Sequence, residues 1–169
     1  MRAGIALGSN LGDRLGHLRA ARERLLELHE DDGPFLSSKI YETLPMDCPP
    51  GSAAFLNAVI ELSTSLPPLD LLARLQAIEV ESGRPNIHDH HAPRTLDLDL
   101  LYMDKMRISH SALILPHPRI SERLFVLLPL ADICPERILP NVNHSVRELC
   151  EMMMLNEWSS GTIKLLSNF

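Results

Sequence analysis

Two aspartates, Asp97 and Asp99, stand two residues apart in an otherwise apolar stretch of the sequence. From Leu96 to Leu100, leucine and aspartate alternate strictly, which is the period of a β-strand with one buried face. The leucines would then face a core, and both carboxylates would project from the opposite face with their Cα atoms roughly 6.5 Å apart. Because aspartate is a poor strand former, the pattern indicates either a solvated sheet face or a site for chemistry.

The chemistry that this pair could support is the binding of a hard divalent cation. Mg²⁺ prefers a few carboxylate oxygens together with water and substrate phosphates. Arg94, just before the strand, could supply a positive charge to the same phosphates. Three nearby histidines, His88, His90 and His91, raise the alternative of a transition-metal site. Their spacing matches no familiar zinc arrangement, so a surface loop is the default interpretation.

The composition limits the kinds of protein and binding partner to which these residues can belong. A chain of 169 residues with 45% hydrophobic content suits one domain, residues 1–169, with a substantial core. The net charge of −6 provides no basic field for nucleic acid or a membrane surface, although a few local arginines can still hold a small phosphate ligand. The three cysteines show no C-x-x-C spacing, and no apolar run reaches the length of a membrane span. We therefore expect a cytoplasmic protein without a signal peptide.

The strands that must position the acidic pair are short apolar runs. They predict strands over residues 4–7, 35–43 and 55–63, ahead of the acid-bearing strand at 96–100. Several of these strands are joined by loops without helices. That arrangement favours an α+β fold with a mainly antiparallel sheet over a doubly wound parallel fold.

Two helices are predicted between the strands. The first begins at Asn10 or Asp13, either of which can cap it. The second begins at Pro67–Pro68 and ends at Gly83. The residues expected on the core face of the second helix are Leu69, Leu72, Leu75 and Val80.

Two further helices are predicted after the acidic pair. The first is a short helix over residues 122–128 that Pro129 interrupts or ends. The second is a last helix that starts at the capping box Ser145–Glu148 and runs to about Leu155. The tail beyond Trp158 has no predicted structure.

Some polar residues inside these elements allow two interpretations. Asn57, within the third strand, either has its amide satisfied by backbone partners or recognises the donors and acceptors of a heterocycle. Gln76 and Glu79 lie three residues apart and share a side of the second helix. Gly8 and Gly12 flank a strand-to-helix turn, which is either a phosphate loop or a plain tight turn; the missing P-loop and dinucleotide-binding patterns favour the turn.

Motifs spread over residues 1 to about 155 carry a combined family resemblance. They are Gly8–Asp13, Phe55–Ala58, Gly83–Arg84, Pro93–Asp99, Pro116–Arg119 and Phe125. In their order and identity they resemble the 6-hydroxymethyl-7,8-dihydropterin pyrophosphokinases of folate biosynthesis, and Pro93–Asp99 is the most specific of them. The resemblance implies transfer of pyrophosphate from ATP to the pterin hydroxymethyl group, with release of AMP. It also implies a ferredoxin-like α+β domain with helices on both faces of the sheet, normally a monomer.

The resemblance also assigns roles to individual residues. Asp97 and Asp99 match the ligands of two Mg²⁺ ions, and Arg84 and Arg94 match catalytic phosphate-binding arginines. The implied ATP contacts are Gln76, Glu79, Arg84, Arg94, Leu100, His117 and Arg123. The implied pterin contacts are the aromatic pair Phe55 and Phe125, Asn57 at the polar edge, and Thr43, Pro45 and Met46 in a loop.

Two other functions compete with this interpretation. A metal-dependent nucleotide-sugar transferase also uses an Asp-x-Asp pair, but it would need a longer nucleotide-binding half than this chain offers. A non-catalytic ferredoxin-like module, for instance one that binds RNA, conflicts with the acidic charge and with the lack of an aromatic-basic strand signature. Phosphoryl-type transfer needs positioning, cations and arginines more than a covalent nucleophile, and the chain offers that set.

Overall fold

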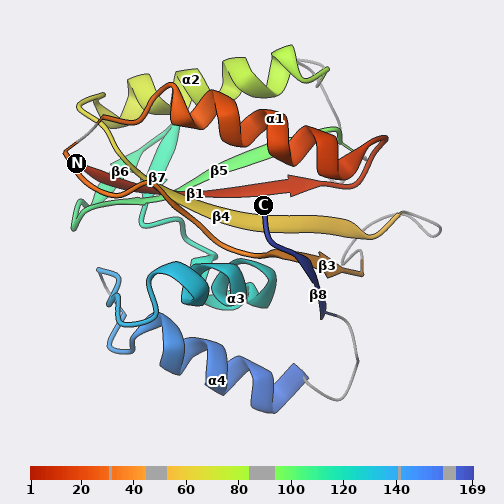
Figure 1. Ribbon diagram of the computed structural model, residues 1–169. Helices are drawn as coiled ribbons and strands as arrows, with labels where there is room; N and C mark the ends of the chain where they lie inside the picture. Colours follow the sequence, from red (N-terminus) through yellow and green to blue (C-terminus); the bar gives the residue numbers. More distant parts are fainter. Residues whose placement is uncertain (31, 45–52, 84–93, 141, 158–162) are drawn as a thin grey trace.

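The computed structural model describes residues 1–30, 32–44, 53–83, 94–140, 142–157 and 163–169 (Figure 1). Its strands are β1 (Arg2–Ser9), β2 (Leu36–Ser37), β3 (Ile40–Thr43), β4 (Phe55–Ser63), β5 (Asp97–Met103), β6 (Ile108–His110), β7 (Leu113–Leu115) and β8 (Ile163–Ser167). Its helices are α1 (Arg14–Leu26), α2 (Pro68–Glu81), a 3₁₀ turn at Ile120–Glu122, α3 (Leu124–Ile133) and α4 (Val146–Glu157).

A six-stranded sheet forms the centre of the molecule. Its order is β5-β1-β4-β3-β8, with β2 also paired to β4, and the pairings in the described chain are antiparallel. In the succession β1-α1-β3-β4-α2-β5, strand β4 lies between β1 and β3, which is the split βαβ arrangement of ferredoxin-like folds. The predicted α+β class with an antiparallel sheet is therefore confirmed.

Helices cover both faces of the sheet, as Figure 1 shows. On one face, α1 and α2 bury Leu18, Leu25 and Leu75 against β1 and its neighbours. On the other face, α3 packs on the sheet and α4 packs on the outer side of α3. A second cluster of buried residues, which includes Val59 and Tyr102, joins that face to the two helices.

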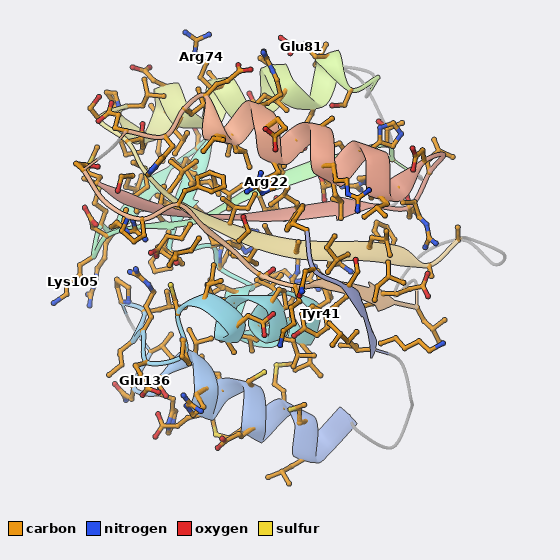
Figure 2. All side chains as sticks on the ribbon, in the orientation of Figure 1. Arg22, Tyr41, Arg74, Glu81, Lys105 and Glu136 are labelled. Atoms are coloured by element: carbon orange, nitrogen blue, oxygen red, sulfur yellow. The ribbon has the colours of Figure 1, made fainter. Side chains whose placement is uncertain are left out.

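The first two helices partly match their predictions. Asp13 rather than Asn10 caps α1, because its Oδ1 accepts a hydrogen bond of 3.0 Å from the backbone N–H of Gly16. The core face of α2 matches its prediction in part: Leu75 is buried and Leu72 packs against the core, but the face is rotated toward Leu71 and Ile78. Its buried residues are Leu71, Leu75, Ile78 and Glu79, whereas Leu69 and Val80 are exposed. Figure 2 shows Arg74 and Glu81 on the outer side of the same helix.

The C-terminal third holds one confirmed prediction, one correction and one strand that the sequence did not predict. The capping box is confirmed: the backbone N–H of Ser145 donates to Glu148 (2.7 Å), and the backbone N–H of Glu148 donates to the Ser145 hydroxyl (3.3 Å). Pro129 does not end its helix but lies inside α3, where tight packing of an almost wholly apolar segment outweighs the one lost hydrogen bond. Within the unassigned tail, Ile163–Ser167 form β8, which pairs with β3. No helix in the described residues is long and apolar enough to cross a membrane.

Candidate active site

One row of residues crosses three neighbouring strands and organises the site. In the sheet register, Gly8 of β1 lies opposite Asn57 of β4 on one side and opposite Asp97 of β5 on the other. A Cβ atom added at Gly8 would lie 3.5 Å from Asn57 Oδ1, 3.8 Å from Asp97 Cβ and 4.0 Å from Phe55 Cδ1. Three predicted site residues therefore surround a glycine that leaves the sheet surface between them open. The sequence marked Gly8 as part of a turn or phosphate loop and of the Gly8–Asp13 motif, but not as a site residue between Asn57 and Asp97.

The Asn57 side of this row has a fixed amide orientation. Asn57 Nδ2 donates a hydrogen bond of 2.8 Å to Thr43 Oγ1, and both residues are buried. Because the amide nitrogen is directed to Thr43, the acceptor Oδ1 faces Gly8. Thr43 in turn lies opposite Phe55 in the pairing of β3 with β4. The structure thus brings these three predicted pterin contacts together, whereas Pro45 and Met46 lie outside the described residues.

The acidic pair lies on the face that the alternation predicted. Leu96, Leu98 and Leu100 are 0%, 5% and 3% exposed in the core, while Asp97 and Asp99 are only partly buried on the other face. Burial, followed by the negative charge of Asp97, raises the pKa of the Asp99 carboxyl, and nearby cationic groups offset only part of this rise. A bound divalent cation would oppose both effects.

The donor set at this pair fits magnesium. Within the described ranges, no group of three or more His, Cys, Asp or Glu side chains could hold a metal ion. Mg²⁺ is commonly held by one or two carboxylates and completes its coordination with water and substrate phosphates. Two hard-oxygen ligands with room beside them, as at Asp97 and Asp99, match that mode.

Each carboxylate of the pair has an arginine partner. Arg94 Nη1 lies 2.8 Å from Asp97 Oδ1, and Arg123 Nη1 lies 3.4 Å from Asp99 Oδ2. The Arg123 guanidinium carbon also lies 5.6 Å from the ring centroid of Phe125. Arg123 therefore connects the acidic pair with the aromatic residue on the first turn of α3. Arg84, the other predicted phosphate-binding arginine, lies outside the described residues.

The two predicted nucleotide contacts on α2 differ in their surroundings. Glu79 is buried, and its Oε1 accepts a hydrogen bond of 2.7 Å from the backbone N–H of Leu98, between the two aspartates. This contact satisfies a backbone donor of β5, which is an edge strand of the sheet. Gln76 is exposed one turn earlier, and no hydrogen bond is seen between it and another described site residue.

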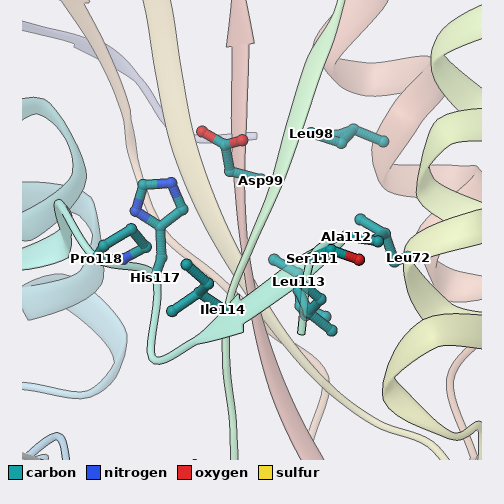
Figure 3. Close-up of a pocket in the computed structure, with 10 residues that line it drawn as sticks. Leu72, Leu98, Asp99, Ser111, Ala112, Leu113, Ile114, His117 and Pro118 are labelled. Carbon is teal, nitrogen blue, oxygen red and sulfur yellow. The ribbon is translucent and has the colours of Figure 1, made fainter. Parts of the chain in front are cut away.

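A pocket of about 280 Å³ opens beside the acidic pair. Figure 3 shows Asp99 and His117 on one side of it and Leu72 of α2 on the other. Leu100, predicted as an ATP contact, also lines the pocket. The stretch Ser111–Ile114 forms a further wall that the sequence did not mark, because no local pattern distinguishes a hairpin turn that faces a pocket from one that faces solvent.

His117 presents a neutral ring to this pocket. Burial lowers the pKa of its imidazole, and the attraction of Asp99 only partly opposes this effect. The backbone N–H of Arg119 donates to Nδ1 at 3.2 Å. In the neutral ring Nδ1 must then be the acceptor, so the proton resides on Nε2, which can donate to a ligand.

The fold and the site together define a class of protein: a ferredoxin-like domain with an arginine-flanked carboxylate pair suited to phosphate-bound Mg²⁺. Comparison with known proteins narrows this class. The sequence model of the 7,8-dihydro-6-hydroxymethylpterin-pyrophosphokinase (HPPK) family matches residues 4–135. The chain belongs to this family.

Individual relatives agree with that assignment. The chain is 48% identical over 132 residues to a 2-amino-4-hydroxy-6-hydroxymethyldihydropteridine pyrophosphokinase of Bacillus subtilis, covering 78% of this chain and 77% of the relative. It is 40% identical over 141 residues to the enzyme of the same name from Pseudomonas aeruginosa, covering 83% and 85%. A crystal structure of an HPPK-DHPS in complex with substrates matches the fold with a TM-score of 0.75 at 15% identity. The match covers 98% of this chain and 46% of that one, so the chain spans about half the length of the solved protein.

Proposed function

We propose that the protein transfers pyrophosphate from ATP to 6-hydroxymethyl-7,8-dihydropterin, giving the pterin diphosphate and AMP in folate synthesis. Family membership supports this activity. The observation that supports it for this chain is the row Asn57–Gly8–Asp97, in which an amide oxygen and an aspartate carboxylate lie on either side of one open glycine. Family membership also argues against the nucleotide-sugar transferase and the non-catalytic module.

The pterin would bind on the Asn57 side of Gly8. The Asn57 Oδ1 atom faces the open surface and can accept a hydrogen bond from the N–H edge of a pterin. Phe55 borders the same surface from the sheet, and Phe125 is supplied by α3. Two aromatic rings from separate layers suit the stacking of a flat heterocycle between them.

ATP would bind on the Asp99 side. The pocket next to Asp99 is lined by Leu72, Leu98 and Ile114, which suits a nucleoside base. His117, with its proton on Nε2, can donate to a ribose or phosphate oxygen. We assign Arg84 and Arg94 to the β- and γ-phosphates, together with Arg123.

The reaction would proceed by in-line attack. The pterin hydroxyl oxygen forms a bond to the β-phosphorus of ATP, the bond from that phosphorus to the oxygen bridging to the α-phosphorus breaks, and AMP departs with the bridging oxygen. The hydroxyl proton passes to solvent water. Arg94 and Arg123, which pair with the two aspartates, would hold phosphate oxygens and stabilise the charge that develops on them.

Magnesium is the cation that the carboxylates would hold. We propose two Mg²⁺ ions at Asp97 and Asp99, as the family resemblance implies. When bound, they would neutralise phosphate charge and align the triphosphate for displacement. Strand β8 joins the tail to the same sheet, so we propose that residues 1–169 form one domain. A monomer is proposed because the family resemblance implies one.

The decisive experiment measures the nucleotide product. Purified protein with ATP, Mg²⁺ and the hydroxymethyl pterin should release AMP in a pterin-dependent reaction, and Asp97→Asn should abolish it. The matched control is Asp70→Asn, which removes an exposed carboxylate from the first turn of α2 and should leave AMP release unchanged. Release of ADP, or turnover that does not depend on the pterin, would refute the proposal.

A further inference from the structure

The residue after β1, Asn10, makes two hydrogen bonds to the backbone of Arg94 and to no other described residue. The backbone N–H of Asn10 donates to the Arg94 carbonyl at 3.1 Å, and the backbone N–H of Arg94 donates to Asn10 Oδ1 at 2.8 Å. Asn10 is only 3% exposed, and the two residues are separated by 84 positions in the chain. A buried contact of this kind fixes the place of one backbone relative to the other.

The contact between Asn10 and Arg94 continues the hydrogen bonding between these two segments beyond the end of the regular sheet. The last paired residues of β1 and β5 at this end are Gly8 and Asp97, so Arg94 lies three residues beyond the ladder. There the side-chain amide oxygen of Asn10 supplies the acceptor that a strand carbonyl would otherwise provide. Leu96, fully buried, anchors the same segment on the other face of the sheet.

The side chain of Arg94 extends from this anchored backbone. Its guanidinium must reach Asp97, 2.8 Å away, and in the proposed reaction the phosphates of ATP. Arginine has four flexible side-chain torsions, and each loses freedom when the guanidinium is held. Fixing the backbone of Arg94 limits how far its guanidinium can be displaced from the phosphates. A displacement of a catalytic group by about 1 Å can lower the rate about 100-fold.

We propose that Asn10 is a positioning residue for Arg94 in the pyrophosphate transfer. Asparagine suits this role because its amide oxygen accepts a hydrogen bond without adding a charge, whereas a third carboxylate beside Asp97 and Asp99 would raise the electrostatic cost of the site. The proposal depends on the proposed function and adds a residue that acts on Arg94 alone.

The test is a double-mutant cycle with Asn10→Leu and Arg94→Ala. Leucine keeps the number and branching of the side-chain heavy atoms of asparagine and removes the acceptor. Asn10→Leu should lower kcat for AMP release about 10- to 100-fold, with KM for the pterin within about twofold of the wild-type value. In the Arg94→Ala background the same substitution should change kcat by less than about twofold, since the residue through which it acts is gone.

Two further measurements separate this role from a structural one. Ser9→Ala, at the neighbouring residue, removes a hydroxyl that makes no hydrogen bond to Arg94 and should leave kcat unchanged. If Asn10→Leu melts at a much lower temperature than the wild type, Asn10→Ala replaces it in the cycle. An equal loss of kcat in both backgrounds, or an unchanged kcat in the wild-type background, would overturn the proposal. Failure of the wild-type protein to release AMP would instead refute the proposed function.

Discussion

The guanidinium of Arg94 lies 2.8 Å from the carboxylate of Asp97, three residues along the chain, and both side chains are partly buried. Asp97 is a proposed ligand of the cation, and Arg94 is a proposed ligand of the ATP phosphates. The two side chains therefore form an ion pair with each other when neither cation nor ATP is bound. Binding of magnesium and ATP would exchange one ion pair for two new contacts. Arg123 and Asp99 form a looser pair of the same kind, at 3.4 Å.

This pairing predicts opposite effects of Arg94→Ala on binding and on rate. Without the competing guanidinium, Mn²⁺ should bind the nucleotide-free protein about three- to tenfold more tightly, the range expected for losing a partly buried ion pair. The rate of AMP release should fall by at least about 100-fold. Titration of Mn²⁺ by electron paramagnetic resonance measures the first quantity. The control is Arg119→Ala, whose guanidinium is exposed and pairs with Glu122; weaker Mn²⁺ binding in Arg94→Ala would contradict the exchange.

Asp99→Asn should raise the stability of the metal-free protein and lower its activity. Burial and the charge of Asp97 raise the pKa of Asp99, so its ionised form destabilises the metal-free fold at neutral pH. The amide keeps the shape and removes the charge, and we expect the melting temperature without metal to rise by about 2–4 °C. AMP release should fall by about 100- to 1000-fold. A lower melting temperature would show that the acidic pair is not under electrostatic strain.

The acidic pair was predictable because its pattern is local. Leu96, Leu98 and Leu100 alternate with the aspartates, and the two faces of a strand follow from that period alone. The row Asn57–Gly8–Asp97 was not predictable, since it depends on the register of two strand pairs far apart in the sequence.

The helices show where the local pattern is ambiguous. Helix α2 carries apolar residues on two overlapping stripes, and only packing selects Leu71 and Ile78 over Leu69 and Val80. The buried Glu79 follows from the same packing, because the edge strand β5 needs an acceptor for the N–H of Leu98. Strand β8 was not predicted, because most of its residues are exposed and its sequence has no alternating apolar pattern.

A charged cluster remote from the site predicts a pH dependence of stability. Glu61 of β4 is 2% exposed and accepts hydrogen bonds from Tyr102 (2.6 Å), from Arg2 Nε (3.0 Å) and from Arg137, which lies between α3 and α4. Burial alone raises the pKa of Glu61, but the hydrogen bonds from Tyr102 and Arg2 and the charges of both arginines outweigh it and lower the pKa.

The sign of the effect follows from that lowered pKa. The unfolded chain takes up a proton at a higher pH than the folded one, so the ionised Glu61 stabilises the fold above its ordinary pKa of 4.5. Glu61→Gln should lower the free energy of unfolding by about 3 kcal/mol at neutral pH, and the difference from wild type should shrink as the pH falls below that value. Urea titrations at several pH values measure it. Glu136→Gln, at an exposed ion pair with Arg147, is the control and should show no such trend; a constant difference across pH would exclude the ionised carboxylate as the cause.

Two glycines on one face of β1 should respond in opposite ways to the same substitution. A Cβ at Gly4 would overlap the ring of Tyr102, which is fully buried, so Gly4→Ala should cost about 1–3 kcal/mol of stability. A Cβ at Gly8 meets only ordinary contacts with Asn57, Asp97 and Phe55, so Gly8→Ala should leave stability unchanged or raise it by about 0.4–1 kcal/mol.

Because that methyl group would fill the open surface between the pterin and cation residues, KM for the pterin should rise about tenfold in Gly8→Ala and stay near the wild-type value in Gly4→Ala. Steady-state kinetics with thermal melts of both variants separate the two effects, and normal pterin kinetics in Gly8→Ala would place the pterin away from the Asn57–Gly8–Asp97 row.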